Sequence, residues 1–475
     1  MGSKIGAKAL MAEVGVPVVP GTSLAELPLK ESVAAARAIG FPVLIKASAG
    51  GGGKGMRIVR DEAAFTEALA TARREAESAF GDGTLLIERY FDAPRHIEIQ
   101  IFGDVHGNVI YLGERECSIQ RRYQKILEEA PSPAVDATLR ARMGDAAVAA
   151  ARAIGYVGAG TVEFIVDQTG AFYFLEVNTR LQVEHAVTEA VTGLDLVRWQ
   201  ILLAEGAALP LTQAEVALAG HAIEARLYAE DPARDFLPAT GTVLVWEPAA
   251  IAGVRYDSGV EAGSEVGVHY DPLLAKIIAH APTRAEAIVR LRRALEVLGV
   301  GPVVTNRDFL LAVLDHPAFI AGELDTHFIE RHLPVEGRQP TPDAARDRTH
   351  AIVAALYEHE QRRRAGGPLP VSVPSGWRNN RWRAQDVAYL IGGERIEVRY
   401  VAEADGRFLV EGDGAGNECR VLAADARGLA VEIDGVRRRF TVTAGAGVLV
   451  VHGPLGTATL KPVPRFPPSE REDLA

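Results

Sequence analysis

Apolar and polar residues alternate with two different periods along this chain, and the periods separate helical from strand-like segments. Apolar side chains three or four residues apart predict amphipathic helices, whereas alternation with a period of two predicts strands. Ile288, Leu291, Leu295 and Leu298 form one such helical stripe. We expect helices at residues 4–14, 30–39, 62–79, 284–298 and 343–364.

The most informative alternating segment is residues 176–185, which read E-V-N-T-R-L-Q-V-E-H. Side chains on an extended strand point alternately to opposite faces. If the segment is extended, one face carries Glu176, Asn178, Arg180, Gln182 and Glu184. A solvated face would suit an isolated strand of this kind. The neighbouring residues favour a ligand-binding face instead.

Residues 161–175 read as two strands around the turn at residues 167–170, D-Q-T-G. A turn centred on residues 168–169 places Glu163 opposite Phe174 and diagonal to Glu176. Diagonal neighbours lie roughly 7–8 Å apart on the same face. Two carboxylates at this separation repel unless a cation lies between them, and Mg²⁺ suits such a pair together with phosphate oxygens.

A glycine-rich segment lies between two short apolar strands. Residues 43–45 form the first strand, Lys46 ends it, and the second strand begins at Met56. Glycines allow backbone N–H groups to close on an anion. A dinucleotide-binding loop requires a helix after it, and none is expected here. A Walker A loop has Ser or Thr after its lysine, whereas Lys54 is followed by glycine. We expect a hairpin flap over nucleotide phosphates, formed by Gly50, Gly51, Gly52 and Gly53; a glycine loop without a ligand is the alternative.

Residues 114–131 form a basic segment with Gln120, Arg121, Arg122 and Lys125. Basic segments suggest anion binding, and nucleic acid would be one possible partner. The formal net charge of the chain is −11, which argues against a polyanion as its main partner. A small anionic ligand remains the better interpretation.

The composition changes after residue 333. Residues 334–343 are rich in proline and polar residues and are expected to be a linker. From residue 383 to 462, short alternating strands are separated by Gly392-Gly393, Asp405-Gly406, Asp434-Gly435 and Gly453-Pro454. They predict a small antiparallel barrel with the helix at 343–364 attached. Residues 466–475 are expected to be a second linker.

Length and composition limit the possibilities further. A chain of 475 residues suggests about three domains. Two cysteines cannot build a disulfide framework or a cysteine-type zinc site. No apolar stretch approaches the roughly 20 residues of a membrane helix. We expect a cytoplasmic protein that binds neither membrane nor nucleic acid.

Six segments in order resemble the biotin carboxylase portion of a biotin-dependent acyl-CoA carboxylase α subunit, an ATP-grasp enzyme. They are M-G-S-K at the start, I-K-A-S-A-G-G-G-G-K-G-M, P-R-H-I-E-I-Q, S-I-Q-R-R-Y-Q-K, E-V-N-T-R-L-Q-V-E-H and H-A-I-E-A-R-L-Y-A-E-D-P. The resemblance covers residues 1–333. It differs at Tyr123, where the family commonly has His, and the family's Rossmann-like amino-terminal domain and its A-M-K-M biotin carrier motif are both absent from the sequence.

The resemblance implies an α+β architecture: an ATP-grasp domain at 1–210 with its lid at 18–90, a biotin carboxylase C-terminal domain at 211–333, and a docking domain of helix plus β-barrel at 344–465. It also implies site residues. The residues that would bind ATP are Lys4, Lys46, the glycine flap, Met56, Glu88, His96 and Gln120, and those that would hold Mg²⁺ or Mn²⁺ are Glu163, Glu176 and Asn178. The residues that would bind bicarbonate and biotin are Lys125, Arg180, Gln182, Val183, Glu184 and Arg226. Four of these would be catalytic: Lys125, Arg180, Glu184 and Arg226.

The implied reaction is ATP-dependent carboxylation of biotin through carboxyphosphate. Glu184 would be the general base, and Arg226 would stabilise the biotin enolate. Expected partners are a biotin carrier domain and a carboxyltransferase β subunit, within a homo-oligomer. Two alternatives remain: another ATP-grasp ligase that joins a carboxylate to an amine, or a catalytically incomplete assembly module. The acyl-CoA substrate cannot be read from this chain.

Overall fold

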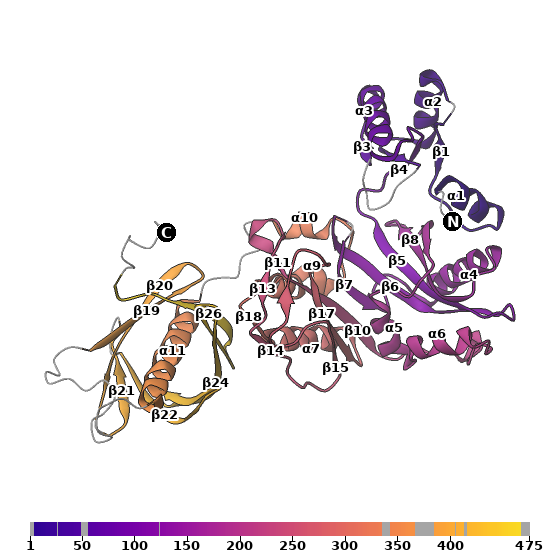
Figure 1. The fold of residues 1–475 in the computed structure, drawn as a ribbon. Coiled ribbons are helices and arrows are strands. Elements are labelled where there is room, and N and C mark those ends of the chain that lie inside the picture. The colour runs from indigo at the N-terminus through magenta and orange to yellow at the C-terminus, as the bar shows by residue number, and fades with distance from the viewer. Residues whose placement is uncertain are drawn as a thin grey trace.

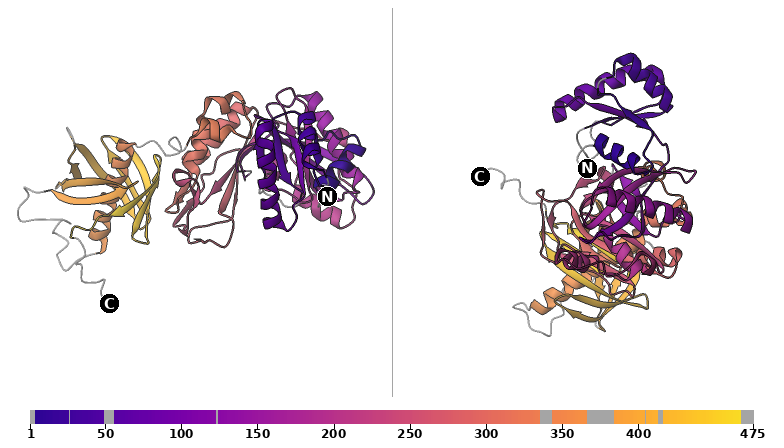
Figure 2. Two further views of the ribbon diagram at one scale, coloured as in Figure 1. Left: turned by 90° about the horizontal axis from the view of Figure 1, so that it is seen from above. Right: turned by 90° about the vertical axis from the view of Figure 1, so that its right-hand side faces the viewer.

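The computed structural model describes residues 4–25, 27–48, 56–122, 124–334, 343–365, 384–403, 405–412 and 416–466. It contains a small four-stranded sheet, a large eight-stranded sheet and a closed barrel, with helices packed on or in each (Figures 1 and 2). The α+β architecture with a carboxy-terminal barrel is therefore confirmed. The glycine flap, Tyr123 and most of both expected linkers lie outside the described residues.

The small sheet corresponds to the expected lid, and its strands follow the order β1-β4-β2-β3. Two helices pack on it through buried residues such as Ala36, Phe65 and Leu69. The second of these helices begins where Asp61 accepts a hydrogen bond from the backbone of Ala64, as an N-cap does. The elements are β1 (Gly21–Ser23), α2 (Leu29–Ile39), β2 (Val43–Ala47), β3 (Arg57–Val59), α3 (Glu62–Phe80) and β4 (Leu85–Arg89).

The large sheet is antiparallel throughout, in the order β15-β17-β10-β7-β6-β5-β8-β9. Its strands are β5 (Arg95–Gly103), β6 (Val109–Arg121), β7 (Gln124–Ala130), β8 (Gly158–Val166), β9 (Phe172–Asn178), β10 (His221–Tyr228), β15 (Val254–Ser258) and β17 (Leu273–Ala281). The chain passes the expected domain boundary at residue 210 and returns as β10, which pairs with β7. One sheet thus spans both expected domains.

Helices cover both faces of the large sheet. On β5, Ile97, Ile99 and Ile101 face α4, and Phe102 packs under α6 on the opposite side. The second face also carries α5, which packs on β10 and β17. These helices are α1 (Lys4–Glu13), α4 (Ala137–Ala153), α5 (His185–Thr192), α6 (Leu196–Ala204) and α7 (Arg284–Glu296).

Short elements complete the region up to residue 334. They form a large apolar core with α7 and the buried face of β10 and β17. They are β11 (Glu230–Asp231), β12 (Leu237–Pro238), β13 (Gly241–Thr242), β14 (Val245–Glu247), β16 (Glu265–Val266), β18 (Gly299–Gly301), α8 (Arg307–Asp315), α9 (Pro317–Ala321) and α10 (Phe328–His332).

The closing domain is an eight-stranded antiparallel barrel that surrounds its helix rather than carrying it outside. The helix α11 (Ala344–Ala365) buries every residue from His350 to Tyr357, as a helix enclosed on all sides does (Figure 1). The strands are β19 (Gln385–Ile391), β20 (Glu394–Ala402), β21 (Arg407–Val410), β22 (Asn417–Asp425), β23 (Gly428–Ile433), β24 (Val436–Gly445), β25 (Val448–Gly453) and β26 (Gly456–Pro462).

All five predicted helices agree with the structure to within two residues at each end. The predicted hairpin turns are also confirmed. Gly392-Gly393 and Asp434-Gly435 both have positive φ at their two central residues, the geometry of a type I′ turn. No helix among the described residues is long and apolar enough to cross a membrane.

Candidate active site

The β8–β9 hairpin brings Glu163 and Glu176 directly opposite each other on one face of the sheet. The expected diagonal register is wrong for two reasons. The loop has three residues, ending at Gly170 with φ 80°, so Phe164 rather than Glu163 pairs with Phe174. A β-bulge then shifts the register by one more residue. The two carboxylates still share a face, as the inference of a metal site requires.

The segment 176–185 is extended only as far as Asn178, so the expected single ligand face is wrong. A turn at residues 183–184 leads directly into α5, with Glu184 at its N-cap position. Gln182 and Glu184 are buried by this change of direction, and Arg180 is exposed. The tertiary fold, rather than strand alternation, therefore brings Gln182 and Glu184 to the large sheet.

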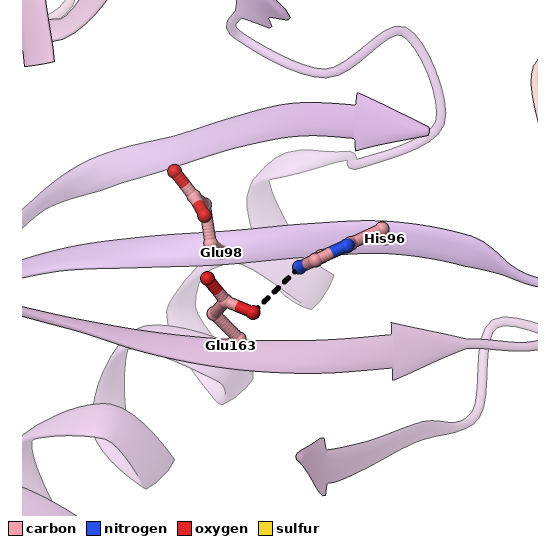
Figure 3. Close-up of side chains that lie close together, drawn as sticks. All are labelled: His96, Glu98 and Glu163. Carbon is pink, nitrogen blue, oxygen red and sulfur yellow. Dashed lines mark hydrogen bonds and ion pairs between the residues drawn. The ribbon is translucent and has the colours of Figure 1, made fainter. Parts of the chain in front are cut away.

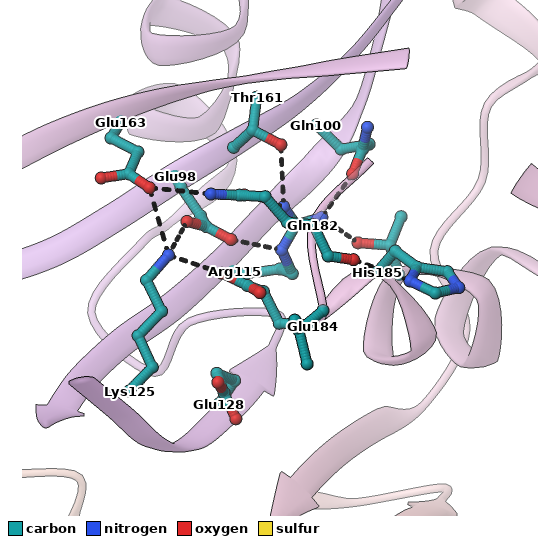
Figure 4. A network of polar contacts seen from close by, with 12 residues as sticks. Glu98, Gln100, Arg115, Lys125, Glu128, Thr161, Glu163, Gln182, Glu184 and His185 are labelled. Carbon is teal, nitrogen blue, oxygen red and sulfur yellow. Dashed lines mark hydrogen bonds and ion pairs between the residues drawn. The ribbon is translucent and has the colours of Figure 1, made fainter. Parts of the chain in front are cut away.

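Lys125, on β7, reaches into a buried polar cluster with its ammonium group (Figure 4). Burial alone would lower the pKa of Lys125, but the surrounding carboxylates raise it well above its usual value. The ammonium group is therefore held in its charged form. Its Nζ donates to Glu98 Oε2 at 2.5 Å, Glu184 Oε1 at 2.5 Å and Glu163 Oε1 at 3.2 Å.

Glu163 also contacts three other polar side chains. Its Oε2 lies 3.0 Å from His96 Nε2 (Figure 3), and its Oε1 accepts from the amides of Asn178 and Gln182, each at 2.9 Å. Burial alone would raise the pKa of Glu163, but His96 and Lys125 lower it below the usual range. Glu163 is therefore an anion at neutral pH.

The oxygen ligands on this hairpin suit a hard divalent cation. Glu163, Glu176 and Asn178 offer carboxylate and amide oxygens, which Mg²⁺ prefers. Glu176 is exposed and can reach a ligand entering from solvent. A second grouping, His96, Glu98 and Glu163, brings three ligand atoms within 4.8 Å of one another. That second set shares Glu163 with the first.

Arg226 extends from β10 toward the same cluster. Its Nε donates to Glu128 Oε1 at 2.5 Å, and its Nη2 donates to Glu184 Oε2 at 2.9 Å. Glu184 therefore accepts from Lys125 with one oxygen and from Arg226 with the other. Burial would raise the pKa of Glu184, but these two cations lower it.

Arg115 is a member of this network that the sequence reasoning missed. It lies on β6, is fully buried, and donates from all three nitrogens. A signal for its environment exists in the alternation of His96, Glu98 and Gln100 with isoleucines on β5. Its acceptors are Glu98 Oε1 (2.6 Å), Gln100 Oε1 (2.7 Å), Thr188 Oγ1 (2.9 Å), Gln182 Oε1 (3.0 Å) and Thr161 Oγ1 (3.1 Å).

In the lid, Lys46 lies on β2 and donates to Glu88 Oε2 on β4 at 2.6 Å. Lys8, on α1, forms an ion pair with the other oxygen of Glu88. Met56 immediately precedes β3. The side chain of Lys4 and the flap at residues 50–53 lie outside the described part of the chain.

The structure thus gathers some of the expected residues and leaves others apart. Gln120 lies on β6 opposite Lys125, and the backbone oxygen of Val183 accepts a hydrogen bond from Lys276. Arg180 contacts the backbone oxygen of Leu181 at the surface. The residues brought into one hydrogen-bonded network are His96, Lys125, Glu163, Asn178, Gln182, Glu184 and Arg226.

Three protein families match successive parts of the chain. Residues 3–212 match "Carbamoyl-phosphate synthase L chain, ATP binding domain", residues 224–331 match "Biotin carboxylase C-terminal domain", and residues 347–465 match "Methylcrotonyl-CoA carboxylase, alpha-subunit, BT domain". The first match covers the small sheet and strands β5 to β9 of the large sheet, the second covers most of β10, β15, β17 and the short elements, and the third covers the barrel.

Individual proteins agree with these families. The chain is 50% identical to a biotin carboxylase of Halalkalibacterium halodurans, over 72% of this chain and 75% of that protein. It is 43% identical to the mitochondrial methylcrotonoyl-CoA carboxylase subunit alpha of Arabidopsis thaliana, over 94% of this chain but 64% of that protein.

One solved structure with a similar fold is the biotin carboxylase domain dimer of Hydrogenobacter thermophilus 2-oxoglutarate carboxylase. That structure is described as a complex with MgADP, ADP and bicarbonate. The TM-score is 0.68 at 43% identity, and the match covers 72% of this chain and 75% of that one.

Proposed function

Because this chain belongs to the biotin carboxylase family, we propose that it catalyses the ATP-dependent carboxylation of biotin with bicarbonate. In this reaction bicarbonate attacks the γ-phosphate of ATP, the bond to ADP breaks, and carboxyphosphate forms. Carboxyphosphate then divides into CO₂ and phosphate, the released phosphate accepts the proton of the ureido nitrogen of biotin, and that nitrogen attacks CO₂.

The observation that carries the proposal is the meeting of Lys125, Glu184 and Arg226 in one hydrogen-bonded chain. These residues come from β7, the start of α5 and β10, and they derive from two of the matched families. Pairing of β10 with β7 assembles two cations around one buried carboxylate. An anion and a proton acceptor can therefore be held side by side.

We assign bicarbonate to Lys125, Arg180, Gln182 and the backbone of Val183. Glu184 is ionised at neutral pH because of its two cations, so it can accept the bicarbonate proton as the oxygen attacks phosphorus. Lys125 donates three hydrogen bonds and can share them with an incoming anion.

Arg226 is assigned to the biotin step. The ureido nitrogen is barely acidic, so its deprotonation requires a fixed cation at the oxygen where negative charge develops. A guanidinium stays charged and donates from a rigid fork. Glu128 and Glu184 hold that fork from two sides.

The nucleotide is assigned to the space between the lid and the β8–β9 hairpin. The proposed ATP contacts are Lys4, Lys46, Gly50, Gly51, Gly52, Gly53, Met56, Glu88, His96 and Gln120. Glu163, Glu176 and Asn178 are the proposed ligands of Mg²⁺ or Mn²⁺, which would neutralise phosphate charge during transfer.

Further assignments extend beyond this chain. We propose domains at 1–210, 211–333 and 344–465, with the barrel docking onto a carboxyltransferase β subunit and a biotin carrier supplying the substrate. A homo-oligomer is in line with the dimer described for the H. thermophilus relative. A cytoplasmic location remains a proposal, since the A. thaliana relative is a mitochondrial protein.

The test measures ATP hydrolysis as bicarbonate and free biotin are added separately and together. We expect hydrolysis to require bicarbonate and to be stimulated by biotin. A different ATP-grasp ligase would respond to another acceptor, and an assembly module would show no turnover. Either result refutes the proposal.

Arg226→Ala makes the assignment specific. Loss of one preorganised donor should lower biotin carboxylation by about 10²–10³-fold while ATP still binds. Arg292→Ala is the matched control, because Arg292 is a half-exposed arginine of α7 that pairs with Asp315. Near-normal carboxylation by Arg226→Ala would remove Arg226 from the mechanism.

A further inference from the structure

Glu224 is a completely buried carboxyl group to which the proposed mechanism gives no role. It lies on β10, two residues before Arg226 and on the same face of the sheet. Both of its carboxyl oxygens are buried without a hydrogen-bond partner, and so is Glu128 Oε2. Among the described residues, three of the six such orphaned side-chain atoms therefore belong to these two glutamates.

The two glutamates are direct cross-strand partners. Glu224 pairs with Glu128 across the β10–β7 ladder, and directly opposite residues have Cβ atoms about 4.5–5.5 Å apart. Two ionised carboxylates cannot share such a position in a buried site without a cation between them. Arg226 binds Glu128 through its other oxygen, Oε1.

Burial and the neighbouring carboxylates oppose the ionisation of Glu224, whereas Lys276 and Arg226 favour it. On β17 its direct partner is Ile278, and α5 covers this part of the sheet with Ala186 and Val187. The ammonium group of Lys276, on β17, contacts Val183 O and Asp257. The charged groups that face Glu224 are Glu128 from β7, Lys276 from β17, Arg226 on its own strand and Glu184 from the start of α5.

We propose that Glu224 is an un-ionised carboxylic acid whose O–H donates to Glu128 Oε2, and that it thereby acts as a positioning residue for Arg226. One proton shared by the pair supplies the donor that the orphaned oxygens lack. The proposal places the single negative charge of the pair on Glu128, because Arg226 is bonded to that residue. The pair then carries a single charge that matches the guanidinium.

The direction of the pKa shifts agrees with this geometry. Burial and the neighbouring Glu128 raise the pKa of Glu224 well above its usual value. Burial also raises the pKa of Glu128, although Arg226 opposes that shift. The role of Arg226 in carboxylation rests on the proposed function, but the protonation of Glu224 does not.

The first experiment therefore needs no turnover. Infrared difference spectroscopy of the full chain at neutral pH should show the carbonyl stretch of a buried un-ionised carboxylic acid, and Glu224→Gln should remove it. Glu114→Gln is the matched control, because Glu114 is also buried on the large sheet but bonded to Arg140, and the band should remain. Absence of the band in the unmodified protein, or its persistence in Glu224→Gln, overturns the proposal.

The second experiment tests positioning. Glu224→Gln keeps a neutral donor and should retain biotin carboxylation within about threefold, whereas Glu224→Leu should lower kcat about tenfold with little change in the KM for ATP. The alkaline limb of the rate profile, where Glu224 loses its proton, should disappear in Glu224→Gln. Equal rates and equal pH profiles in Glu224→Gln and Glu224→Leu would refute the role of Glu224 as a positioning residue. If the unmodified protein shows the infrared band but neither it nor the variants carboxylate biotin, the proposed function is refuted and the protonation of Glu224 is not.

Discussion

Replacement of Arg115 tests whether the buried network holds the site together. Arg115→Met keeps the length of the side chain but removes five hydrogen bonds, one of them to Glu98. Lys125 then remains as an ion-pair partner of Glu98. Breaking a buried ion pair by removing one partner costs about 3–5 kcal/mol. The amide oxygens of Gln100 and Gln182 also lose their shared donor.

We expect about 3–5 kcal/mol of destabilisation, confined to the large sheet. Because the chain has several cores, hydrogen exchange of peptides from β5 and β6 measures this better than a single global melting curve. The same variant should raise the KM for bicarbonate, since Gln182 loses the bond that orients its amide. Barrel peptides provide an internal reference whose exchange should not change.

Two arginine variants serve as controls. Arg115→Lys keeps the charge but loses the planar fork, so it should recover part of the protection. Arg140→Met removes a bidentate partner of Glu114, but Arg140 is a quarter exposed, so its loss should cost less. If the amides of β5 and β6 exchange as slowly in Arg115→Met as in the unmodified chain, the network does not stabilise the sheet.

Three further predictions concern other parts of the molecule. Four hydrogen bonds lower the pKa of Asp104 to about 2 although burial opposes the shift, so its stabilisation is complete above pH 4 and is lost as pH falls toward 2. Asp104→Asn should cost about 1–2 kcal/mol at pH 6 in urea unfolding and progressively less toward pH 3; a deficit independent of pH would contradict this. In Gly301→Val the new Cβ would lie 3.2 Å from Val450 Cγ1 of the barrel, so the barrel should separate from the preceding domain and the radius of gyration from X-ray scattering should rise; an unchanged radius would show that the contact is dispensable. Ala354→Leu overfills the barrel around α11 and should destabilise it by about 1–3 kcal/mol in thermal unfolding, whereas Ala345→Leu at the exposed start of the helix should not; equal effects would refute the enclosed packing.

Local pattern in the sequence was sufficient for much of the fold. The barrel turns could be predicted because paired Gly or Asp-Gly residues supply the positive φ that a two-residue hairpin turn needs. Glu163 and Glu176 could be placed on one face because two short strands joined by a tight turn must pair with each other. These features depend on residues fewer than fifteen positions apart.

The exact register of that hairpin was beyond local reasoning. The three-residue loop and the bulge at Glu163–Phe164 each shift the pairing by one residue. The extension of strand β9 past Asn178 was predicted wrongly for a related reason. Alternation describes a strand only where a partner strand is available, and the chain instead turns into α5 to bury Glu184.

The sequence by itself thus determined several of the helices, the strands of the barrel and the chemical types of the site residues. Only the tertiary structure decided that β10 lies beside β7, which joins Arg226 to a cluster about a hundred residues earlier in the chain. Which strands become neighbours depends on how helices pack on both faces of the sheet, and here α5 and α7 pack on opposite faces. That choice also places Glu224 opposite Glu128, a pairing of two carboxyl groups that no local pattern encodes.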